Sequence, residues 1–403
     1  MTQASQTVAG TQANTALLSR NRTSKRNYSD MIVQAARDGN VSPLRQFREI
    51  ALLKSRRNGF TPKEYYDMQI YRSDLSWAQK REFVGEMGSY RLNLRLAPPE
   101  ITQMRGFLSD KLALTSVLTQ FGLPTTTTQA VFATDRNLGK IRTLRNEADI
   151  VGFITNEARF PLFGKPVTSF QAIGTIGITS VVAGEGVAHL TSGRSTSVAA
   201  LATEIVAHHP DGFMFQDAVQ QHPKVTELVG PAVGTCRVVT VMNDGHPRVL
   251  YAVWKVPSPG AMADNFWQSG SMLALPDIAT GEVIKCRRGA GPSTEWIETH
   301  PISGLPICGF VLPKWQSVID TALAAHGIFP INGILGWDIA IGPDGGRVIE
   351  CNENTCHTLY QCASGRGVLN ADFLPAFAKV DAHNDATKQK FRNFNRAVQA
   401  TLP

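Results

Sequence analysis

Three oxygen-bearing side chains interrupt the last pair of apolar runs in this 403-residue sequence. Asp338 and Glu350 stand equally far from Asp344, the centre of the turn sequence at 343–346, so a simple hairpin places them opposite each other. Opposed carboxylates on paired strands repel at about 5 Å between Cβ atoms, and a divalent cation between them removes the repulsion. Asn352 adds a third oxygen on the same face. This all-oxygen set predicts a magnesium site, with manganese as an alternative, over zinc. Two surface acids in a shifted register are the competing interpretation.

Four basic residues stand where local structure does not favour a positive charge. Lys111 falls in the first turn of a helix expected over 109–121, where a cation opposes the helix dipole. Lys165 and Arg237 interrupt apolar strands, and Lys255 ends one. Each alone fits an edge position or a long side chain that reaches the surface equally well. Together, in a chain that also offers a magnesium hairpin, they predict a site for the phosphates of a nucleotide.

Two further segments fit a phosphate site. The segment 168–179 carries Gly174 and Gly177 between two strands, and its backbone N–H groups could fold over phosphates. It is not a Walker loop, because the chain has no Gly-Lys-Ser/Thr sequence. Arg237 and Lys255 are expected nearly opposite each other on one hairpin, an arrangement that calls for an anion between them.

A cysteine and histidine cluster near the last hairpin suggests a competing zinc hypothesis. Cys351, Cys356, His357 and Cys362 have the spacing C-x4-C-H-x4-C, which matches no strong zinc pattern. Cys351 alternates with Glu350 and Asn352 and should therefore face the core. For Cys356 and His357, a place in a substrate loop and a packing role remain equally open.

The elements around these residues predict an α+β fold. Helical spacing dominates from residue 28 to about 95, and short β-runs follow residue 126, interrupted by a helix near 195–208. Three hairpins are expected, with turns at 243–245, 280–281 and 343–346. Helices near 313–327 and 372–399 complete a layout of antiparallel sheets that carry helices.

Composition excludes several classes of protein. No run reaches the roughly 18–20 apolar residues of a membrane helix, so we expect no membrane protein. Six cysteines without a CxxC pair favour a reducing cytoplasm over a disulfide scaffold. Residues 1–100 hold 16 Lys and Arg against 9 Asp and Glu, which accounts for the whole net charge of +7. These charges are dispersed among acids, so we favour a solvated helical surface over a nucleic-acid partner.

Taken in order, these motifs resemble the ATP-grasp superfamily. The motifs are SDK at 109–111, FGKP with Lys165, the strand FMFQDAV, TCRVVT with Arg237, WKVP with Lys255, and ECN ending at Asn352. QQHPKV, DNFWQSGSM, THPISGLPICGFVLPKW and GWDIAIGPDG are most similar to its sugar-transfer-associated subgroup. The resemblance covers about residues 60–370, and the final acid-to-acid motif is its most specific part.

The resemblance implies roles at named positions. Lys111 and Lys165 would contact ATP phosphates, the backbone of Gln216, Asp217 and Val219 would meet the adenine, and Gly174 and Gly177 would belong to the flexible loop over the nucleotide. Arg237 would stabilise an acyl phosphate, and Lys255 would approach the phosphates. Asp338, Glu350 and Asn352 would hold magnesium. The implied fold is a small α/β lid lobe and a larger antiparallel-sheet lobe that grip ATP.

The expected domains are a disordered leader (1–27), a basic helical region (28–105), the small lobe with its preceding helix (106–212) and the large lobe (213–403). The family implies an ATP- and magnesium-dependent ligase that couples a small-molecule carboxylate to an amine. The alternatives are a kinase that acts on a small molecule or sugar and a noncatalytic ATP-binding protein. A homodimer remains open. His222-Pro223-Lys224 replaces the usual ribose acid, and Gln216 stands where many relatives have Glu.

Overall fold

The computed structural model describes residues 16–17, 28–54, 58–102, 105–168, 173–182, 184–258, 261, 264 and 270–401. The chain divides into two compact units, and each is described by itself. The smaller unit comprises residues 1–21 and 128–217, and the larger comprises 22–127 and 218–403.

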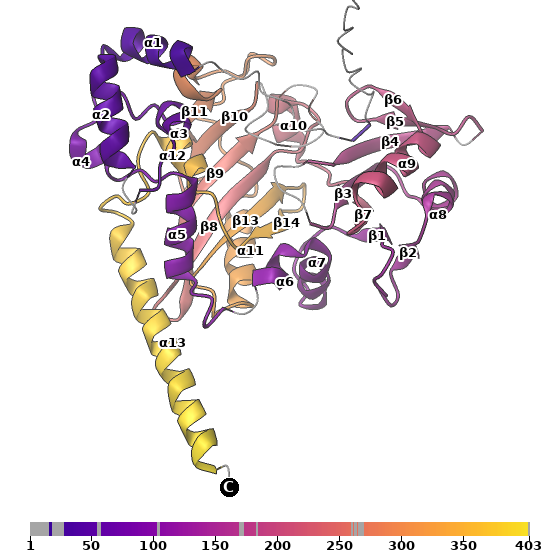
Figure 1. The fold of residues 1–403 in the computed structure, drawn as a ribbon. Coiled ribbons are helices and arrows are strands. Elements are labelled where there is room, and N and C mark those ends of the chain that lie inside the picture. Colours follow the sequence, from indigo (N-terminus) through magenta and orange to yellow (C-terminus); the bar gives the residue numbers. More distant parts are fainter. Residues whose placement is uncertain are drawn as a thin grey trace, which may run out of the picture. The chain divides into compact units, whose positions relative to one another are not determined.

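The smaller unit is built on a seven-stranded sheet with the order β2-β1-β7-β3-β4-β5-β6 (Figure 1). Its neighbours are antiparallel except for the parallel pair β1–β2. The strands are β1 (Thr128–Phe132), β2 (Arg142–Leu144), β3 (Leu162–Pro166), β4 (Ile176–Val182), β5 (Val187–Leu190), β6 (Ser195–Ser197) and β7 (Phe213–Asp217). Its helices are α8 (Glu147–Gly152), which continues into a π-helix (Phe153–Glu157), and α9 (Val198–His208).

The larger unit holds a second seven-stranded sheet with the order β12-β11-β10-β9-β8-β13-β14, antiparallel throughout. The strands are β8 (Thr235–Asn243), β9 (His246–Val256), β10 (Met272–Pro276), β11 (Val283–Arg288), β12 (Glu295–Ile297), β13 (Ile334–Ile341) and β14 (Gly346–Asn352). The β8–β9 turn consists of Asp244 and Gly245, both with positive φ (52° and 79°), the backbone that a two-residue hairpin turn of type I′ requires.

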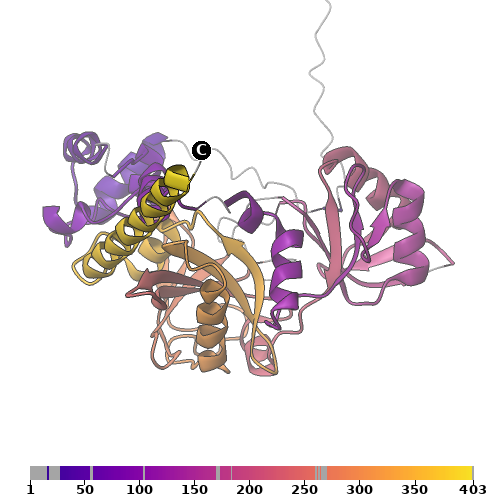
Figure 2. The same ribbon diagram turned by 90° about the horizontal axis from the view of Figure 1, so that it is seen from below.

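Helices cover both faces of this larger sheet. The first face packs against α1 (Tyr28–Gly39), α2 (Pro43–Leu53), α3 (Pro62–Asp67), α5 (Glu86–Leu96), α12 (Thr358–Ser364) and α13 (Leu374–Thr401). The second packs against α6 (Arg105–Ser109), α7 (Lys111–Gln120), α10 (Pro223–Val229) and α11 (Trp315–Gly327). Figure 2 shows α11 and α13 on opposite sides of the sheet. The short α4 (Trp77–Lys80) follows α3, and a 3-10 turn (Gly291–Ser293) precedes β12.

A buried charge network ties the N-terminal helices of the larger unit together. Glu49 of α2 accepts hydrogen bonds from Lys80 Nζ (2.7 Å), Tyr65 Oη (2.7 Å) and Arg45 Nε (2.9 Å). Burial raises the pKa of this carboxyl, but the Lys80 and Tyr65 hydrogen bonds outweigh it, and the net pKa lies below its usual value. Burial in turn lowers the pKa of Lys80, which is 1% exposed. Every member of this network belongs to the helical region itself.

The expected α+β class with antiparallel sheets is confirmed, and turns lie at all three expected hairpins. The compact units differ from the expected boundaries at 105/106 and 212/213, because α6 and α7 belong to the larger unit and β7 to the smaller one. The division into functional lobes therefore stays a prediction.

Part of the expected leader is ordered. Ala16 and Leu17 are buried, and their backbone N–H groups donate to the Glu204 carboxylate of α9 at 2.9 and 3.2 Å. The expectation of a disordered leader is therefore wrong at these two residues, while 1–15 and 18–27 lie outside the described residues. Among the helices that the structure describes, none is both long and apolar enough to cross a membrane.

Candidate active site

Three neighbouring strands of the larger sheet bring two cations onto one carboxylate. Arg237 on β8 lies directly opposite Asp338 on β13, and Lys255 projects from β9 on the other side of β8. Arg237 donates through Nε to Oδ1 and through Nη2 to Oδ2 at 3.0 Å, and Lys255 Nζ donates to Oδ2 at 2.8 Å. The three side chains are buried, at 6%, 9% and 2% exposure for Arg237, Lys255 and Asp338.

These charges stabilise one another in the protein interior. Burial alone raises the pKa of Asp338, but the charges and hydrogen bonds of Arg237 and Lys255 outweigh it and hold this pKa well below its usual value. Burial lowers the pKa of Lys255, and the carboxylates of Asp264 and Asp338 more than offset this, so its pKa is raised. All three groups are therefore ionised at neutral pH.

The two cations are diagonal neighbours, which corrects the expectation that they lie nearly opposite. Arg237 pairs with Val253, whereas Lys255 pairs with Thr235, which lies two residues before Arg237 on β8. The anion between them is the carboxylate of Asp338, supplied by a strand far away in the sequence. Gly336 gives Arg237 its space, because a Cβ there would come within 3.2 Å of the Arg237 Cδ.

Glu350 on β14 lies opposite Asp338, as the spacing of the hairpin predicts. Its side chain is 28% exposed, and its Oε2 lies 3.9 Å from Lys111 Nζ. Asn352 Nδ2 donates weakly to Glu350 Oε1 at 3.4 Å. The expected repulsion between Asp338 and Glu350 is thus relieved by cations of the protein itself.

Lys111 begins α7 in its first turn, as expected, and is buried. The helix is capped by Asp110, one residue beyond the start expected at 109. Asp110 Oδ1 accepts from the backbone N–H groups of Leu112 and Ala113 at 3.0 Å each, while the Ser109 hydroxyl donates back to Arg105 O. The Asp110 carboxylate satisfies two of the free N–H groups at this helix end.

The other predicted residues fall mainly in the smaller unit. Lys165 is buried on β3, and Gln216 is buried on β7 between β3 and β1. Asp217, the last residue of β7, accepts from Arg159 Nη2 at 3.1 Å and Gln129 Nε2 at 2.6 Å. Val219 lies just past the boundary, in the larger unit.

Packing accounts for both predicted loop glycines. Gly174 has a φ of +80°, and a Cβ on Gly177 would come within 2.3 Å of the Thr191 hydroxyl. The part of the expected phosphate loop at 169–172 lies outside the described residues. The expectation that the segment 168–179 folds over the phosphates of a nucleotide therefore stays a prediction.

Asp264 is a member of the cluster that the sequence did not reveal. Its carboxylate accepts from the Thr235 backbone N–H at 2.7 Å and lies 3.4 Å from Lys255 Nζ. Burial raises its pKa to about 6, although Lys255 opposes that shift. No periodic pattern surrounds Asp264, so only its position next to buried cations marks it.

The cysteine and histidine residues near the last hairpin are dispersed. Cys351 packs into the core on the second face of the sheet, as its alternation predicts, whereas Cys362 packs into the core on the first. His357 is fully buried; its Nδ1 meets Tyr251 Oη at 2.8 Å and its Nε2 meets Asn93 Oδ1 at 3.0 Å. Asn93 Nδ2 donates elsewhere, so Oδ1 must accept, which makes His357 an Nε2–H tautomer that accepts from Tyr251.

A family model described as sugar-transfer associated ATP-grasp matches residues 100–374, which is more than half of the chain and includes Lys111, Arg237, Lys255, Asp338 and Glu350. The chain belongs to this ATP-grasp family. No curated protein sequence matches it significantly.

Solved structures of the ATP-grasp type show only a distant likeness. An L-amino acid ligase from Bacillus licheniformis is 13% identical, with 64% of this chain and 43% of that chain covered and a TM-score of 0.36. A D-alanine-D-alanine ligase from Coxiella burnetii is 11% identical, with 72% and 61% covered and a TM-score of 0.37. A biotin carboxylase from Campylobacter jejuni is 11% identical, with 68% and 46% covered and a TM-score of 0.40. This ATP-grasp chain thus spans about half the length of these proteins.

The oxygen atoms of Asp338, Glu350 and Asn352 suit a hard divalent cation such as magnesium only in part. Glu350 is partly exposed, and Asn352 turns its Nδ2 toward Glu350 Oε1 at 3.4 Å, so rotation of the Asn352 amide would bring its Oδ1 toward a shared cation. Asp338 is ionised, but three of the roughly four acceptor positions of its carboxylate are taken by Arg237 and Lys255. The residues fit a cation held mainly by Glu350 and Asn352, with Asp338 supplying charge beside it.

Proposed function

We propose that this protein is an ATP- and magnesium-dependent ligase that joins a small carboxylate to an amine. The observation that carries the proposal is the joint placement of Arg237, Lys255 and Asp338 in one buried cluster, next to the half-exposed Glu350. This cluster lies within the segment that matches the ATP-grasp family. Buried cations fixed by strand register form a preorganised environment for developing negative charge.

The reaction we infer has two steps. A carboxylate oxygen of the substrate attacks the γ-phosphorus of ATP, the bond to the bridging oxygen breaks, and ADP leaves. The amine nitrogen then attacks the acyl carbon, loses a proton, and phosphate leaves with its bonding electrons. Neither step needs a nucleophile from the protein, so positioning and charge neutralisation are the main tasks of the site.

The cations divide these tasks in our proposal. Lys111 and Lys255 from the larger unit, and Lys165 from the smaller, would neutralise phosphate oxygens. Arg237 carries several donors in one plane, so it can address a phosphoryl oxygen and the carboxyl-derived oxygen together, which a lysine cannot. The backbone of Gln216, Asp217 and Val219 would meet the adenine edge, and Gly174 and Gly177 would flank the closing loop.

Magnesium would be held by Glu350 and Asn352 with help from the charge of Asp338, and when bound it would neutralise phosphate oxygens. The 3.9 Å approach of Lys111 to Glu350 supports this assignment, because it puts a phosphate-binding cation beside the metal-binding carboxylate. Manganese would satisfy the same oxygen ligands.

The test is ADP release with pairs of candidate acids and amines, with products read by mass spectrometry. A ligase releases ADP and phosphate together with a coupled product, whereas a kinase releases ADP and a phosphorylated product without free phosphate. We expect Glu350→Gln to lower turnover by about 1,000-fold, in line with loss of one preorganised charge. The neighbouring Glu353→Gln should leave turnover unchanged. Full turnover by Glu350→Gln with magnesium as the only metal would rule out the proposed site.

A further inference from the structure

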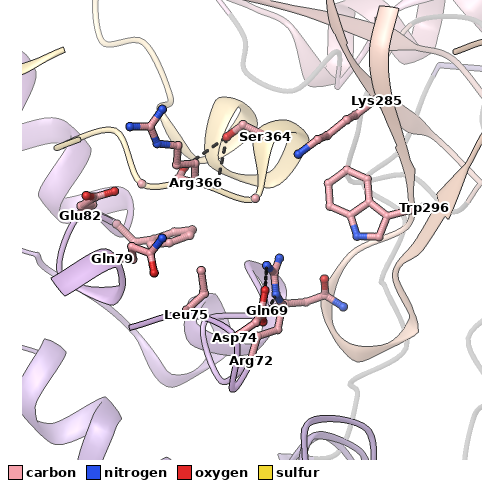
Figure 3. Close-up of a pocket in the computed structure, with 13 residues that line it drawn as sticks. Gln69, Arg72, Asp74, Leu75, Gln79, Glu82, Lys285, Trp296, Ser364 and Arg366 are labelled. Atoms are coloured by element: carbon pink, nitrogen blue, oxygen red, sulfur yellow. Dashed lines mark hydrogen bonds and ion pairs between the residues drawn. The ribbon is translucent and has the colours of Figure 1, made fainter. Parts of the chain in front are cut away.

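A pocket lies in the larger unit, outside the proposed active site. It has a volume of about 720 Å³, within the range of small-ligand pockets. Three parts of the chain form it: the segment after α3, the strands β11 and β12, and the turn after α12. Figure 3 shows their side chains around the opening, among them Gln69, Arg72, Glu82, Lys285, Trp296 and Arg366.

Strand register places this pocket on the same sheet face as the charged cluster. Lys255 pairs with Leu273, Leu273 with Arg287, and Arg287 with Trp296. Paired residues share a face of the sheet, so Trp296 lies on the same face as Lys255. It lies three strands away, which is about 14 Å at the usual strand spacing. Leu273 and Arg287 are both buried between them.

Arg287 makes the wall between the two sites rigid. Its guanidinium donates to the backbone oxygens of Gly289, Cys362 and Asp67 and to the Thr294 hydroxyl. These bonds use the donors of a 1% exposed side chain, so it cannot turn toward a ligand without leaving carbonyls unsatisfied. The pocket is therefore a separate site and not an extension of the phosphate-binding cluster.

The pocket lining combines one exposed aromatic face with paired charges. Trp296 is 44% exposed, with Lys285 Nζ 5.9 Å from its ring centroid. Arg72 is already paired with Asp74 through two hydrogen bonds, and Arg366 with Asp372 at 2.6 Å. Glu82 Oε2 is buried and, within the part of the chain that the structure describes, has no hydrogen-bond partner.

Gly365 opens the space between the two sides of the site. It has a φ of +70°, and a Cβ there would lie 3.2 Å from Arg72 Nη1 and 3.8 Å from the Trp296 ring. The backbone therefore lines the pocket at this point without a side chain. A flat ligand can approach the indole face and the Arg72–Asp74 pair together.

The charge balance of the lining selects the ligand class. An anionic ligand would meet Asp74 and Glu82, and a cationic one would meet Arg72, Lys285 and Arg366. A neutral ligand with many hydroxyl groups suits both sets, because each hydroxyl can donate to a carboxylate or accept from a cation. Glu82 Oε2 needs such a donor, and burial raises the pKa of this carboxyl by more than the charge of Arg366 lowers it. An exposed indole offers an apolar platform for the C–H face of a ring.

We propose that this pocket binds a neutral saccharide, stacked on Trp296 and hydrogen bonded to Glu82 and the Arg72–Asp74 pair. This site does not depend on the proposed ligase reaction, because none of its lining residues belongs to the phosphate-binding cluster.

Saturation-transfer NMR on the full chain, without ATP, tests the proposal. The probes are glucose, galactose, N-acetylglucosamine, maltose and lactose, with glutamate and uridine monophosphate as charged comparisons. We expect signals from at least one saccharide and a loss of at least ten-fold in affinity in Trp296→Ala. Trp77→Ala is the matched control, because Trp77 is 41% exposed and lies outside the pocket. Its affinity should equal that of the wild type.

Three results would overturn the saccharide site. The first is the absence of signal from all five saccharides, and the second is binding that Trp296→Ala leaves unchanged in a variant with wild-type thermal unfolding. The third is Trp296-dependent binding of glutamate or uridine monophosphate but of no saccharide. ATP plays no part in these measurements, so failure of the ligase proposal would leave their outcome unaffected.

Discussion

Two buried carboxylates of the larger unit, Glu49 and Asp338, are held by cations in different ways. Glu49 lies among helices and receives one lysine, one tyrosine and one arginine, the last of which is 44% exposed at its side chain. Asp338 lies within a sheet and receives a bidentate arginine and a lysine, both buried. Both carboxyl groups have lowered pKa values because the cations outweigh burial.

The surroundings of the two clusters separate structure from function. Around Glu49 the charged groups satisfy one another, and Lys80 and Tyr65 are almost fully buried. Around Asp338 there are further charges: Asp264 beside Lys255, and Glu350 and Lys111 at a partly exposed end. We infer that the first cluster holds helices in place and that the second is assembled to meet a ligand.

The largest expected effect concerns the helical cluster. Lys80→Met removes a buried ammonium and leaves the Glu49 carboxylate without its shortest cation contact, which should lower the free energy of unfolding by about 3–5 kcal/mol. Urea denaturation followed by tryptophan fluorescence measures it, since all six tryptophans lie in the larger unit. Turnover of the folded fraction should stay at the wild-type level.

Arg45→Met is the control for this variant, because Arg45 binds the same carboxylate from a half-exposed position. Arg45→Met should lower the free energy of unfolding by less than about 1 kcal/mol. Equal losses from both variants would mean that burial does not distinguish the two cations.

In the sheet cluster, Arg237→Lys should separate binding from chemistry. A lysine keeps the positive charge beside Asp338 but loses the planar set of donors, so ATP affinity should stay within a few-fold of wild type. Coupled product should fall by about 100-fold, because the lost contact matters mainly in the transition state. Calorimetry and mass spectrometry on the same preparation measure both. Product at the wild-type rate, or a parallel collapse of ATP binding, would remove Arg237 from the proposed chemistry.

The smallest expected effect is a dependence of stability on pH, to which buried histidines on both faces of the larger sheet contribute. Burial lowers the pKa of His326 to about 4 and of His357 to about 3, so the unfolded chain binds their protons first as pH falls below 6.5. Each histidine therefore removes about 1.4 kcal/mol of stability per pH unit between pH 6 and 4.5. The pKa of Asp264 is raised to about 6, so the folded chain binds this proton first as the pH falls. This proton uptake adds about the same amount of stability over the same pH range. Together these three groups should cost about 1.4 kcal/mol of stability per pH unit as the pH falls, and His209 and His300, whose pKa values burial also lowers, add to this loss.

Asp264→Asn should steepen the loss of stability by about 1.4 kcal/mol per pH unit, because it removes the opposing group and leaves the histidines. Urea denaturation at pH 6.0, 5.2 and 4.5 measures it for the wild type and the variant. An unchanged slope would mean that Asp264 titrates near its ordinary pKa, and that its carboxylate is not desolvated beside Lys255.

Local patterns predicted the pairing within the last hairpin, but not how the strands reach it. Ile341 pairs with Gly346, so the centre of the hairpin lies before Asp344, and the irregularity between Asp338 and Ile339 brings Glu350 opposite Asp338. The alternation around Cys351 predicted the direction of its side chain. The pairing and this alternation are both short-range properties of a single hairpin. Local reasoning also placed Lys111 in the first turn of its helix, although the helix begins after the Asp110 cap and not at residue 109.

Long-range pairing explains what the sequence could not show. Asp338 accepts from Arg237 because β13 pairs with β8, a contact across about a hundred residues that no local pattern encodes. The turn at Asp244 and Gly245 offsets Lys255 from Arg237, and the irregularity between Val239 and Thr240 reduces this offset by one residue, which leaves the two cations diagonal. Asp264 lies outside any helix or strand, so periodicity gave no reason to select it. The tertiary fold alone brings these groups together.

Calorimetric titration of the full chain with ATP, with and without magnesium, measures the proposed nucleotide site itself. We expect saturable binding in magnesium, at least ten-fold weaker binding without it, and a similar weakening in Glu350→Gln but not in Glu353→Gln. An absence of ATP binding in magnesium, or equal affinities for the wild type and Glu350→Gln, would contradict the claim that the Asp338 and Glu350 strands carry an ATP site.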